Sequence, residues 1–185
     1  NKTTIVVDSN KTNPGKNGTI TIKAKTLWSP SGDSGSKYTA AHGIAAGNFS
    51  QRFNKKVSED LVKTTINADV VIEELRGGSI KTTGISSMDC SDLAINGRFT
   101  IKPGAISLMQ WNRGDQSKTY GIYMIGSNNT ISITSADIDD SKNGSLSDLI
   151  KTDESLWGGK TEKNVLRIGG GTLKVKENQK ERYLI

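Results

Sequence analysis

Residues 107–134 read S-L-M-Q-W, N-R-G-D-Q-S-K-T, Y-G-I-Y-M-I, G-S-N-N and T-I-S-I-T. This stretch has the clearest secondary-structure pattern in the chain. Three runs of strand composition are separated by two turn-rich connections, which is typical of a β-meander. In the last run, Ile131 and Ile133 fall on one face and Ser132 on the other. Residues 126–129, Gly-Ser-Asn-Asn, suit a tight hairpin because Gly and Asn tolerate positive φ.

The same alternation recurs near both ends of the chain. Residues 3–8 and 18–24 predict an opening β-hairpin, and residues 164–176 predict a second hairpin that turns at Gly169-Gly170-Gly171. The sequence therefore predicts an all-β fold of short strands in meanders and hairpins. At most one or two short helices are expected, at residues 49–63 and at residues 145–150.

A change of composition suggests a division of the chain. Residues 29–47 are rich in Gly and Ser, which predicts a flexible surface loop. We therefore expect an N-terminal β-hairpin and loop over residues 1–47, followed by a β-rich region over residues 48–185. These two parts can also form one unit.

The core expected from this composition is thin. Only 33% of the residues are hydrophobic and 5% are aromatic, below the usual apolar share of roughly 45–50%. The single cysteine, Cys90, excludes an intrachain disulfide. Apolar faces such as Ile131/Ile133 then need another surface to cover them. The sequence therefore predicts an elongated homotrimer, in which three chains about one axis cover these faces.

Several partners are not expected from the sequence. The net charge is +6, but the Lys and Arg residues are scattered singly, so no nucleic-acid partner is expected. No apolar run approaches the ~20 residues that a membrane span needs. His42 is the only histidine, which argues against a histidine-rich metal site. We expect no cofactor and no metal.

Two segments are similar to the signatures of trypsin-like proteases. Residues 32–36, Gly-Asp-Ser-Gly-Ser, match the nucleophile segment, and residues 39–43, Thr-Ala-Ala-His-Gly, match the histidine segment. In those enzymes the histidine lies far upstream of the serine, whereas here Ser34 precedes His42 by eight residues. A Gly-rich loop cannot hold a nucleophile, a base and an oxyanion hole in register. We therefore expect no enzymatic activity.

One segment carries a family resemblance. Residues 92–101, D-L-A-I-N-G-R-F-T-I, resemble the D-L-x-V/I-x-G-x-F/L-x-V/I segments of bacteriophage tail fibres, and Trp111 with Tyr120-Gly121-Ile122 is similar to a W…Y-G-I pattern of fibre domains. The resemblance implies a non-enzymatic module of a parallel, intertwined homotrimer in the virion. Such a module joins adjoining fibre segments and attaches to a host cell-surface glycan or protein receptor.

The candidate receptor contacts surround the loop at residues 112–119. Trp111 and Tyr120 at the base of the loop offer ring faces on which sugars stack, and Arg113 and Asp115 offer hydrogen bonds to hydroxyl groups. Arg113-Gly114-Asp115 also matches the integrin-binding tripeptide. The simpler interpretations are that both aromatic residues belong to the core and that Arg113 pairs with Asp115 within a turn.

Two alternative functions follow from the same composition. The chain can be a bacterial surface adhesin domain, which is equally β-rich and non-enzymatic and lies outside the cell. It can also be a fragment of a glycan-degrading tailspike, in which a parallel β-helix carries paired carboxylates. The densest acidic cluster for that chemistry comprises Asp137, Asp139 and Asp140.

Overall fold

The computed structural model describes residues 2–6, 18–25, 40–47, 61–78, 81–108, 118–141, 145–153 and 163–174. Within these ranges the chain forms β-strands and no helix, which confirms the all-β prediction. The strands are β1 (Lys2–Val6), β2 (Thr19–Lys25), β3 (Ala40–Gly47), β4 (Val62–Asn67), β5 (Asp69–Gly78), β6 (Lys81–Met88), β7 (Ser91–Ile101), β8 (Ile106–Leu108), β9 (Lys118–Ile125), β10 (Thr130–Asp139), β11 (Asp148–Asp153), β12 (Val165–Ile168) and β13 (Gly171–Lys174).

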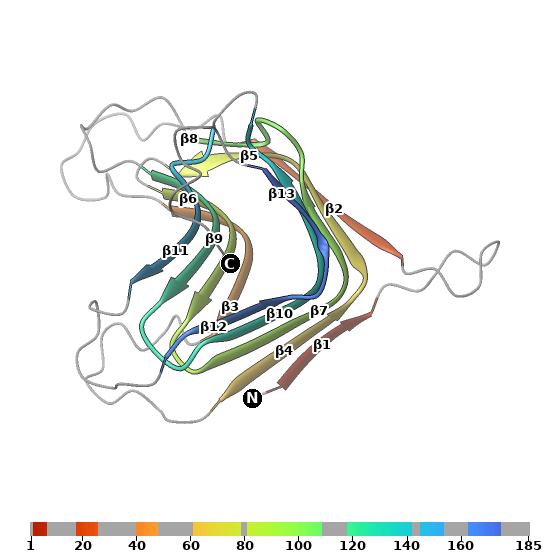
Figure 1. Ribbon diagram of the computed structural model, residues 1–185, viewed down its shortest axis with the longest axis vertical. Helices are drawn as coiled ribbons and strands as arrows, with labels where there is room; N and C mark the ends of the chain where they lie inside the picture. Colours follow the sequence, from red (N-terminus) through yellow and green to blue (C-terminus); the bar gives the residue numbers. More distant parts are fainter. Residues whose placement is uncertain are drawn as a thin grey trace.

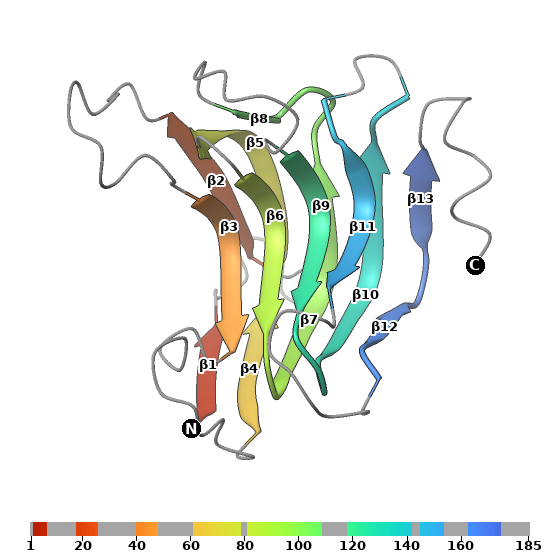
Figure 2. The same ribbon diagram turned by 90° about the vertical axis from the view of Figure 1, so that its left-hand side faces the viewer.

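All strand pairs in the described residues are parallel. Sheet A has nine strands, with the path β1-β4-β7-β10-β12 and with β2, β5, β8 and β13 alongside, and sheet B has the order β3-β6-β9-β11. No described strand pairs with its immediate neighbour in sequence, and paired strands are one turn of the chain apart, as β4 pairs with β7 and β6 with β9. The chain therefore winds as a parallel β-solenoid (Figures 1 and 2).

The expected meanders and hairpins are wrong. Strands β9 and β10 flank the predicted hairpin at residues 126–129, but β9 belongs to sheet B and β10 to sheet A. Likewise, β1 pairs with β4 and β2 with β5, while β12 and β13 both pair with β10. Alternating side chains look the same in parallel and antiparallel strands, so the pattern located the strands without fixing their partners.

Two local predictions are wrong, and a third concerns residues that are mostly outside the described ranges. The helical turn expected at residues 145–150 is wrong, because β11 begins within it. Residues 40–47 were expected in a surface loop, but they form β3 in sheet B. The helix expected at residues 49–63 lies mostly outside the described residues, and its last two positions belong to β4.

The division at residue 47 stays a prediction. The strand pairs β1–β4, β2–β5 and β3–β6 connect residues 2–47 to the strands that follow.

Columns of aliphatic side chains fill the interior. Among the columns that the pairing defines are Ile66-Ile95-Ile133-Ile168, Ile22-Ile72-Ile101-Ile138-Leu173 and Ile44-Ile85-Ile122-Ile150. Members in the middle turns are buried, while those in the first and last turns are partly buried. Each full burial stabilises the fold by roughly 1.5–3 kcal/mol, so middle turns contribute most.

The corner within sheet A is built on Asn96-Gly97. The Asn96 side-chain amide donates a hydrogen bond of 2.7 Å to the Asn67 side-chain oxygen one turn away. The N–H of Arg98 donates one of 2.8 Å to the Asp69 carboxylate. A Cβ at Gly97 would lie 2.1 Å from the Ala68 carbonyl oxygen, so only glycine fits. This Asn-Gly pair, a hairpin signal in the sequence, is a corner through which β7 continues.

Sheet B bends around a column of glycines at Gly43, Gly84 and Gly121. A Cβ at Gly84 would lie 2.6 Å from the Gly121 carbonyl oxygen and 2.9 Å from Cδ1 of Ile101. Without side chains at these positions, core isoleucines pack directly on the backbone at the bend. The bend gives sheet B a concave outer side (Figure 1).

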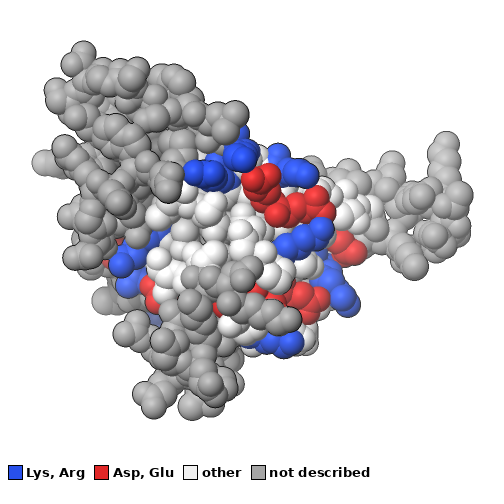
Figure 3. Space-filling view, turned by 90° about the horizontal axis from the view of Figure 1, so that it is seen from above, with Lys and Arg blue, Asp and Glu red and all other residues white. Residues whose placement is uncertain are grey.

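Opposite charges alternate along the outside of sheet A. The Lys102 ammonium pairs with Glu73, and Lys174 lies 3.9 Å from Asp139. Lys23 pairs in register with Glu74. The hydrogen bond and the charge of Lys102 lower the pKa of Glu73, and the charge of Lys23 adds to this effect. We call Lys23, Glu73, Lys102, Asp139 and Lys174 the charge ladder. Figure 3 shows Lys and Arg interspersed with Asp and Glu, and not a patch of one sign.

The geometry of the corner predicts that substituting Gly97 destabilises the protein far more than substituting Gly170. We expect Gly97→Ala to destabilise the protein by about 3 kcal/mol, because the new methyl group collides with a backbone carbonyl of the adjacent turn. Gly170→Ala is the matched control, because nothing lies within 4 Å of a Cβ there. Urea unfolding measures both variants. Equal transition midpoints for the two would contradict this account of the corner.

Candidate receptor-contact site

Strand β9 presents different side chains to its two faces. Ile122 and Met124 belong to the main core, whereas Tyr120, Tyr123 and Ile125 form a separate cluster against which Met88 packs. This second set lies on the outer, concave side of sheet B, and we call it the tyrosine cluster. An aromatic group on the outer side of a solenoid lies outside the central core, so packing of the core does not account for it.

The two tyrosines form a tilted pair beneath a lysine. Their ring centroids are 4.9 Å apart with an interplanar angle of 35°. The Lys81 ammonium lies 4.1 Å from the Tyr123 centroid and 6.0 Å from the Tyr120 centroid. This is a cation–π contact, stronger where water is excluded. Lys81 begins β6 and is in register with Lys118 of β9, while Tyr120 and Tyr123 are in register with Thr83 and Ser86, so the long Lys81 side chain reaches along the sheet to the two rings.

Acidic groups complete the other side of the cluster. The Tyr123 hydroxyl donates a hydrogen bond of 3.4 Å to the Asp153 carboxylate of β11. Burial, together with the negative charge of Asp153, raises the pKa of Tyr123 well above its usual value. Burial and the charges of Asp148 and Asp153 also raise the pKa of Tyr120. Both phenols therefore stay protonated and can act as hydrogen-bond donors.

A histidine lies on β3, the strand that pairs with β6. His42 of β3 pairs in register with Thr83 of β6, and its Nδ1 is 2.6 Å from the Thr83 hydroxyl. Burial, followed by the positive charge of Lys81, lowers the pKa of His42 below 6.5. The imidazole is therefore neutral at pH 7. Thr83 is fully buried, so this pair presents no accessible nucleophile.

A buried hydroxyl group sits in the same wall. Ser86 lies in register between Ala45 and Tyr123. It is fully buried, and its hydroxyl has no hydrogen-bond partner in the described structure. Such a group costs about 1–3 kcal/mol. Sheet B therefore has a buried hydroxyl group without a hydrogen bond, that of Ser86, in register with Tyr123.

The residues expected to contact a receptor are only partly placed. Tyr120 lies in the tyrosine cluster and is 7% exposed, while Trp111, Arg113 and Asp115 lie outside the described residues. The prediction for this loop therefore stays a prediction. Where Tyr120 is described, its partners are Tyr123 and Lys81, and its ring is not an open stacking surface.

Nothing in the sequence marks His42, Lys81, Tyr123 and Asp153 as members of one group. They come from four different strands of sheet B, and only the pairing register brings them together. The alternation within residues 120–125 was visible, but it did not show that Tyr120 and Tyr123 share a face. The bend at Gly121 places these two residues, three apart in sequence, on the same side.

The acidic residues expected of a glycan-degrading enzyme have structural partners. Asp137 lies 3.2 Å from the Arg98 guanidinium, and Asp139 belongs to the charge ladder. Asp140 is buried and accepts hydrogen bonds from the N–H groups of Ser145 and Leu146. Ser34 of the protease-like segment lies outside the described residues.

Neither relatives nor a metal site nor a membrane-spanning helix helps to assign a function to the described residues. Comparisons with protein-family models, curated proteins and solved structures found no significant match. Across the described ranges, no group of three or more His, Cys, Asp and Glu residues is arranged to hold a metal ion. No helix in the same ranges has the length and apolar character of a membrane span.

The position of His42 predicts its titration. Because it is the only histidine in the chain, NMR of the imidazole signal follows it alone, and we expect a pKa below 6.5. Lys81→Gln should raise this pKa, because a nearby positive charge disfavours the imidazolium. Since the unfolded state binds the proton more readily, protonation of His42 destabilises the fold as pH falls through 6.5.

A matched variant tests the cause of that shift. Lys102 pairs with Glu73 on sheet A, so Lys102→Gln should leave the His42 titration unchanged. If Lys81→Gln and Lys102→Gln moved the pKa equally, the effect would be one of net charge and the local account would be wrong.

Proposed function

We propose that this chain is a non-enzymatic attachment module, a structural solenoid that contacts a receptor through the outer side of sheet B. Support comes first from the arrangement of the described residues. Aliphatic columns fill the interior, so outward-facing residues are free to vary without loss of the core. On the outside of sheet A these residues include the ion pairs of Arg98 with Asp137 and of Lys102 with Glu73, whereas sheet B carries the tyrosine cluster.

The rim of the tyrosine cluster supplies the contacts in this proposal. Lys81, Asp148 and Asp153 are partly exposed, and Lys151 is exposed. The cation–π contact holds Lys81 in place, and the Tyr123 hydroxyl holds Asp153. Charged groups positioned in this way lose little conformational entropy on binding. Their mixed charge suits hydroxyl-rich or zwitterionic surfaces such as cell-surface glycans or proteins.

The absence of enzymatic activity is part of the proposal. Among the described residues, the one histidine–hydroxyl pair buries its hydroxyl group, and the carboxylates Asp137, Asp139 and Asp140 are engaged in ion pairs or turn contacts. Catalysis needs a base and a nucleophile that a substrate can reach. These pairings favour a binding role over hydrolysis.

The setting we favour is a bacterial surface adhesin. Strands in the middle turns, such as β6 and β7, have neighbours on both sides within the same chain. The solenoid core therefore does not require three interwoven chains. A bacteriophage tail fibre is the second candidate, and it is supported by the resemblance of residues 92–101, which form most of β7.

The solution mass separates the two settings. If the chain is an adhesin module, we expect a monomer of 19.9 kDa by light scattering coupled to gel filtration. A stable mass of about 60 kDa, three times the mass of one chain, would instead support the homotrimer and the tail fibre. The measurement at micromolar concentration is sufficient, because obligate trimers of this kind persist there.

The receptor face predicts a selective loss of binding. We expect Lys81→Gln combined with Lys151→Gln to weaken binding to cells or to an array of glycans at least tenfold, because both charges lie on the outer side of sheet B. Lys102→Gln combined with Lys174→Gln removes two lysines from sheet A and is the control. Equal binding by the two double variants, with circular dichroism showing both folded, would refute sheet B as the contact face.

A further inference from the structure

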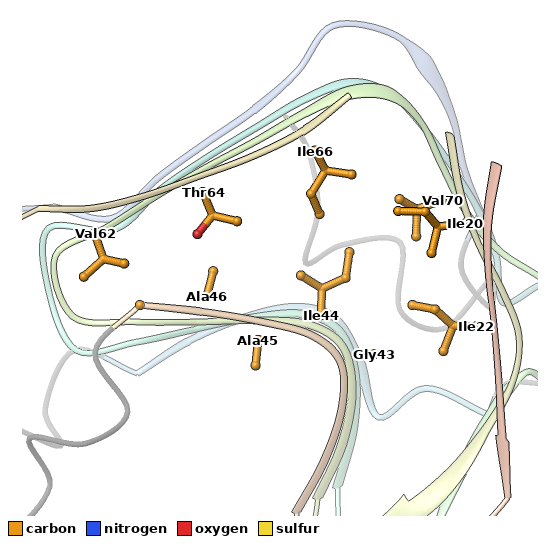
Figure 4. Close-up of a pocket in the computed structure, with 11 residues that line it drawn as sticks. Ile20, Ile22, Gly43, Ile44, Ala45, Ala46, Val62, Thr64, Ile66 and Val70 are labelled. Carbon is orange, nitrogen blue, oxygen red and sulfur yellow. The ribbon is translucent and has the colours of Figure 1, made fainter. Parts of the chain in front are cut away.

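The interior of the solenoid opens at its first turn, which comprises β1, β2 and β3. A hollow of about 470 Å³ lies there, lined chiefly by aliphatic side chains. Figure 4 shows Ile44 and Ala46 of β3 pointing across it toward Thr64 and Ile66 of β4, with Ile20 and Ile22 of β2 at its side. Ala45 points away from it. The hollow is thus a continuation of the core columns and not a surface crevice.

The first turn is incompletely covered. Ile20, Ile22 and Ile44 are partly buried, whereas Val70, Ile72 and Ile85, their neighbours in the second turn, are fully buried. Within the described residues, β1, β2 and β3 each pair with one strand, so each has an outer edge of N–H and C=O groups. These edges continue the hydrogen-bond pattern between turns, which an added parallel strand can use.

The charge ladder determines which strand fits. Along the outside of sheet A, Lys23 is in register with Glu74 and its charge acts on Glu73, Glu73 pairs with Lys102, and Asp139 pairs with Lys174. The next position beyond Lys23 therefore favours a carboxylate. A second copy stacked by its last turn would bring Lys174 to Lys23, and two like charges this close are destabilising. The ladder disfavours head-to-tail association of identical chains.

We propose that the edge formed by β1, β2 and β3 docks an extended segment of another polypeptide as a parallel strand. The segment carries aliphatic side chains at alternate positions, which fill the hollow, and a carboxylate next to Lys23. Backbone hydrogen bonds provide affinity, and the hollow together with Lys23 provides specificity. This interaction does not depend on the attachment role, because it uses the end of the solenoid and not the outer side of sheet B.

The test uses a peptide of stated sequence. Strand β5 already pairs with β2 in parallel, so D-V-V-I-E-E-L-R-G-G, residues 69–78, has the required pattern of aliphatic and acidic residues. With a fluorescent label on the peptide and the full chain titrated in, we expect saturable binding by anisotropy. A peptide in which both glutamates are replaced by lysine should bind at least tenfold more weakly.

Variants of the protein locate the site. Lys23→Glu should reverse the preference between the two peptides, and because Lys23 is exposed, this change leaves the core intact. Ile22→Asp should remove binding of either peptide, by placing a charge in the hollow. Lys174→Glu, at the other end of the charge ladder, is the matched control and should bind the acidic peptide as the parent chain does.

Several outcomes would overturn the proposal. They are no saturable binding of the acidic peptide, equal binding of both peptides, a preference unchanged by Lys23→Glu, or a preference reversed by Lys174→Glu. The last would place the docking edge at β12 and β13. The receptor-binding assay with Lys81→Gln and Lys151→Gln is read separately, so failure of peptide docking leaves the attachment role standing, and the reverse also holds.

Discussion

The structure depends on the stacking of like side chains between successive parallel strands. Ile66 lies over Ile95, and Ile95 over Ile133, because backbone hydrogen bonds fix each turn in register with the next. Each apolar side chain is then covered above and below by another of similar size, and the facing sheet covers it from across the interior, so that no helix is needed. A chain with only 33% hydrophobic residues can fold in this way, since few residues per turn must face inward.

The register that aligns the apolar columns also aligns the polar positions, and this gives the corners their stability. Asn67 and Asn96 meet because Ile66 and Ile95 are paired, and their side-chain hydrogen bond satisfies groups that the corner would otherwise leave unpaired. The same argument applies to Asn129, which is fully buried and whose amide bonds to Ile125 and Asn164. Close approach of the turns leaves no room for a side chain at Gly97. Hydrogen bonding thus favours Asn at position 96, and packing requires Gly at position 97.

Much of the fold was readable in the sequence, but its topology was not. The alternation of Ile131 and Ile133 correctly predicted a strand with one buried face, and both residues are buried. The run Gly-Ser-Asn-Asn correctly predicted a turn with positive φ, as at Gly126 and Asn128. These short-range signals are identical for a hairpin and for a solenoid corner. One partner of β7 is β10, more than thirty residues away, and no local pattern carries that information.

The candidate site was less predictable than the fold, for the same physical reason. Lys81 contacts Tyr123 because β6 pairs with β9, and His42 contacts Thr83 because β3 pairs with β6. A solenoid thus converts distant residues into neighbours, and one shift of register would separate all of them. Stability and recognition are therefore coupled in this chain. The isoleucine columns that hold the turns in place also hold the tyrosine cluster together, so a core substitution in sheet B alters the outer face even where it leaves the strands intact.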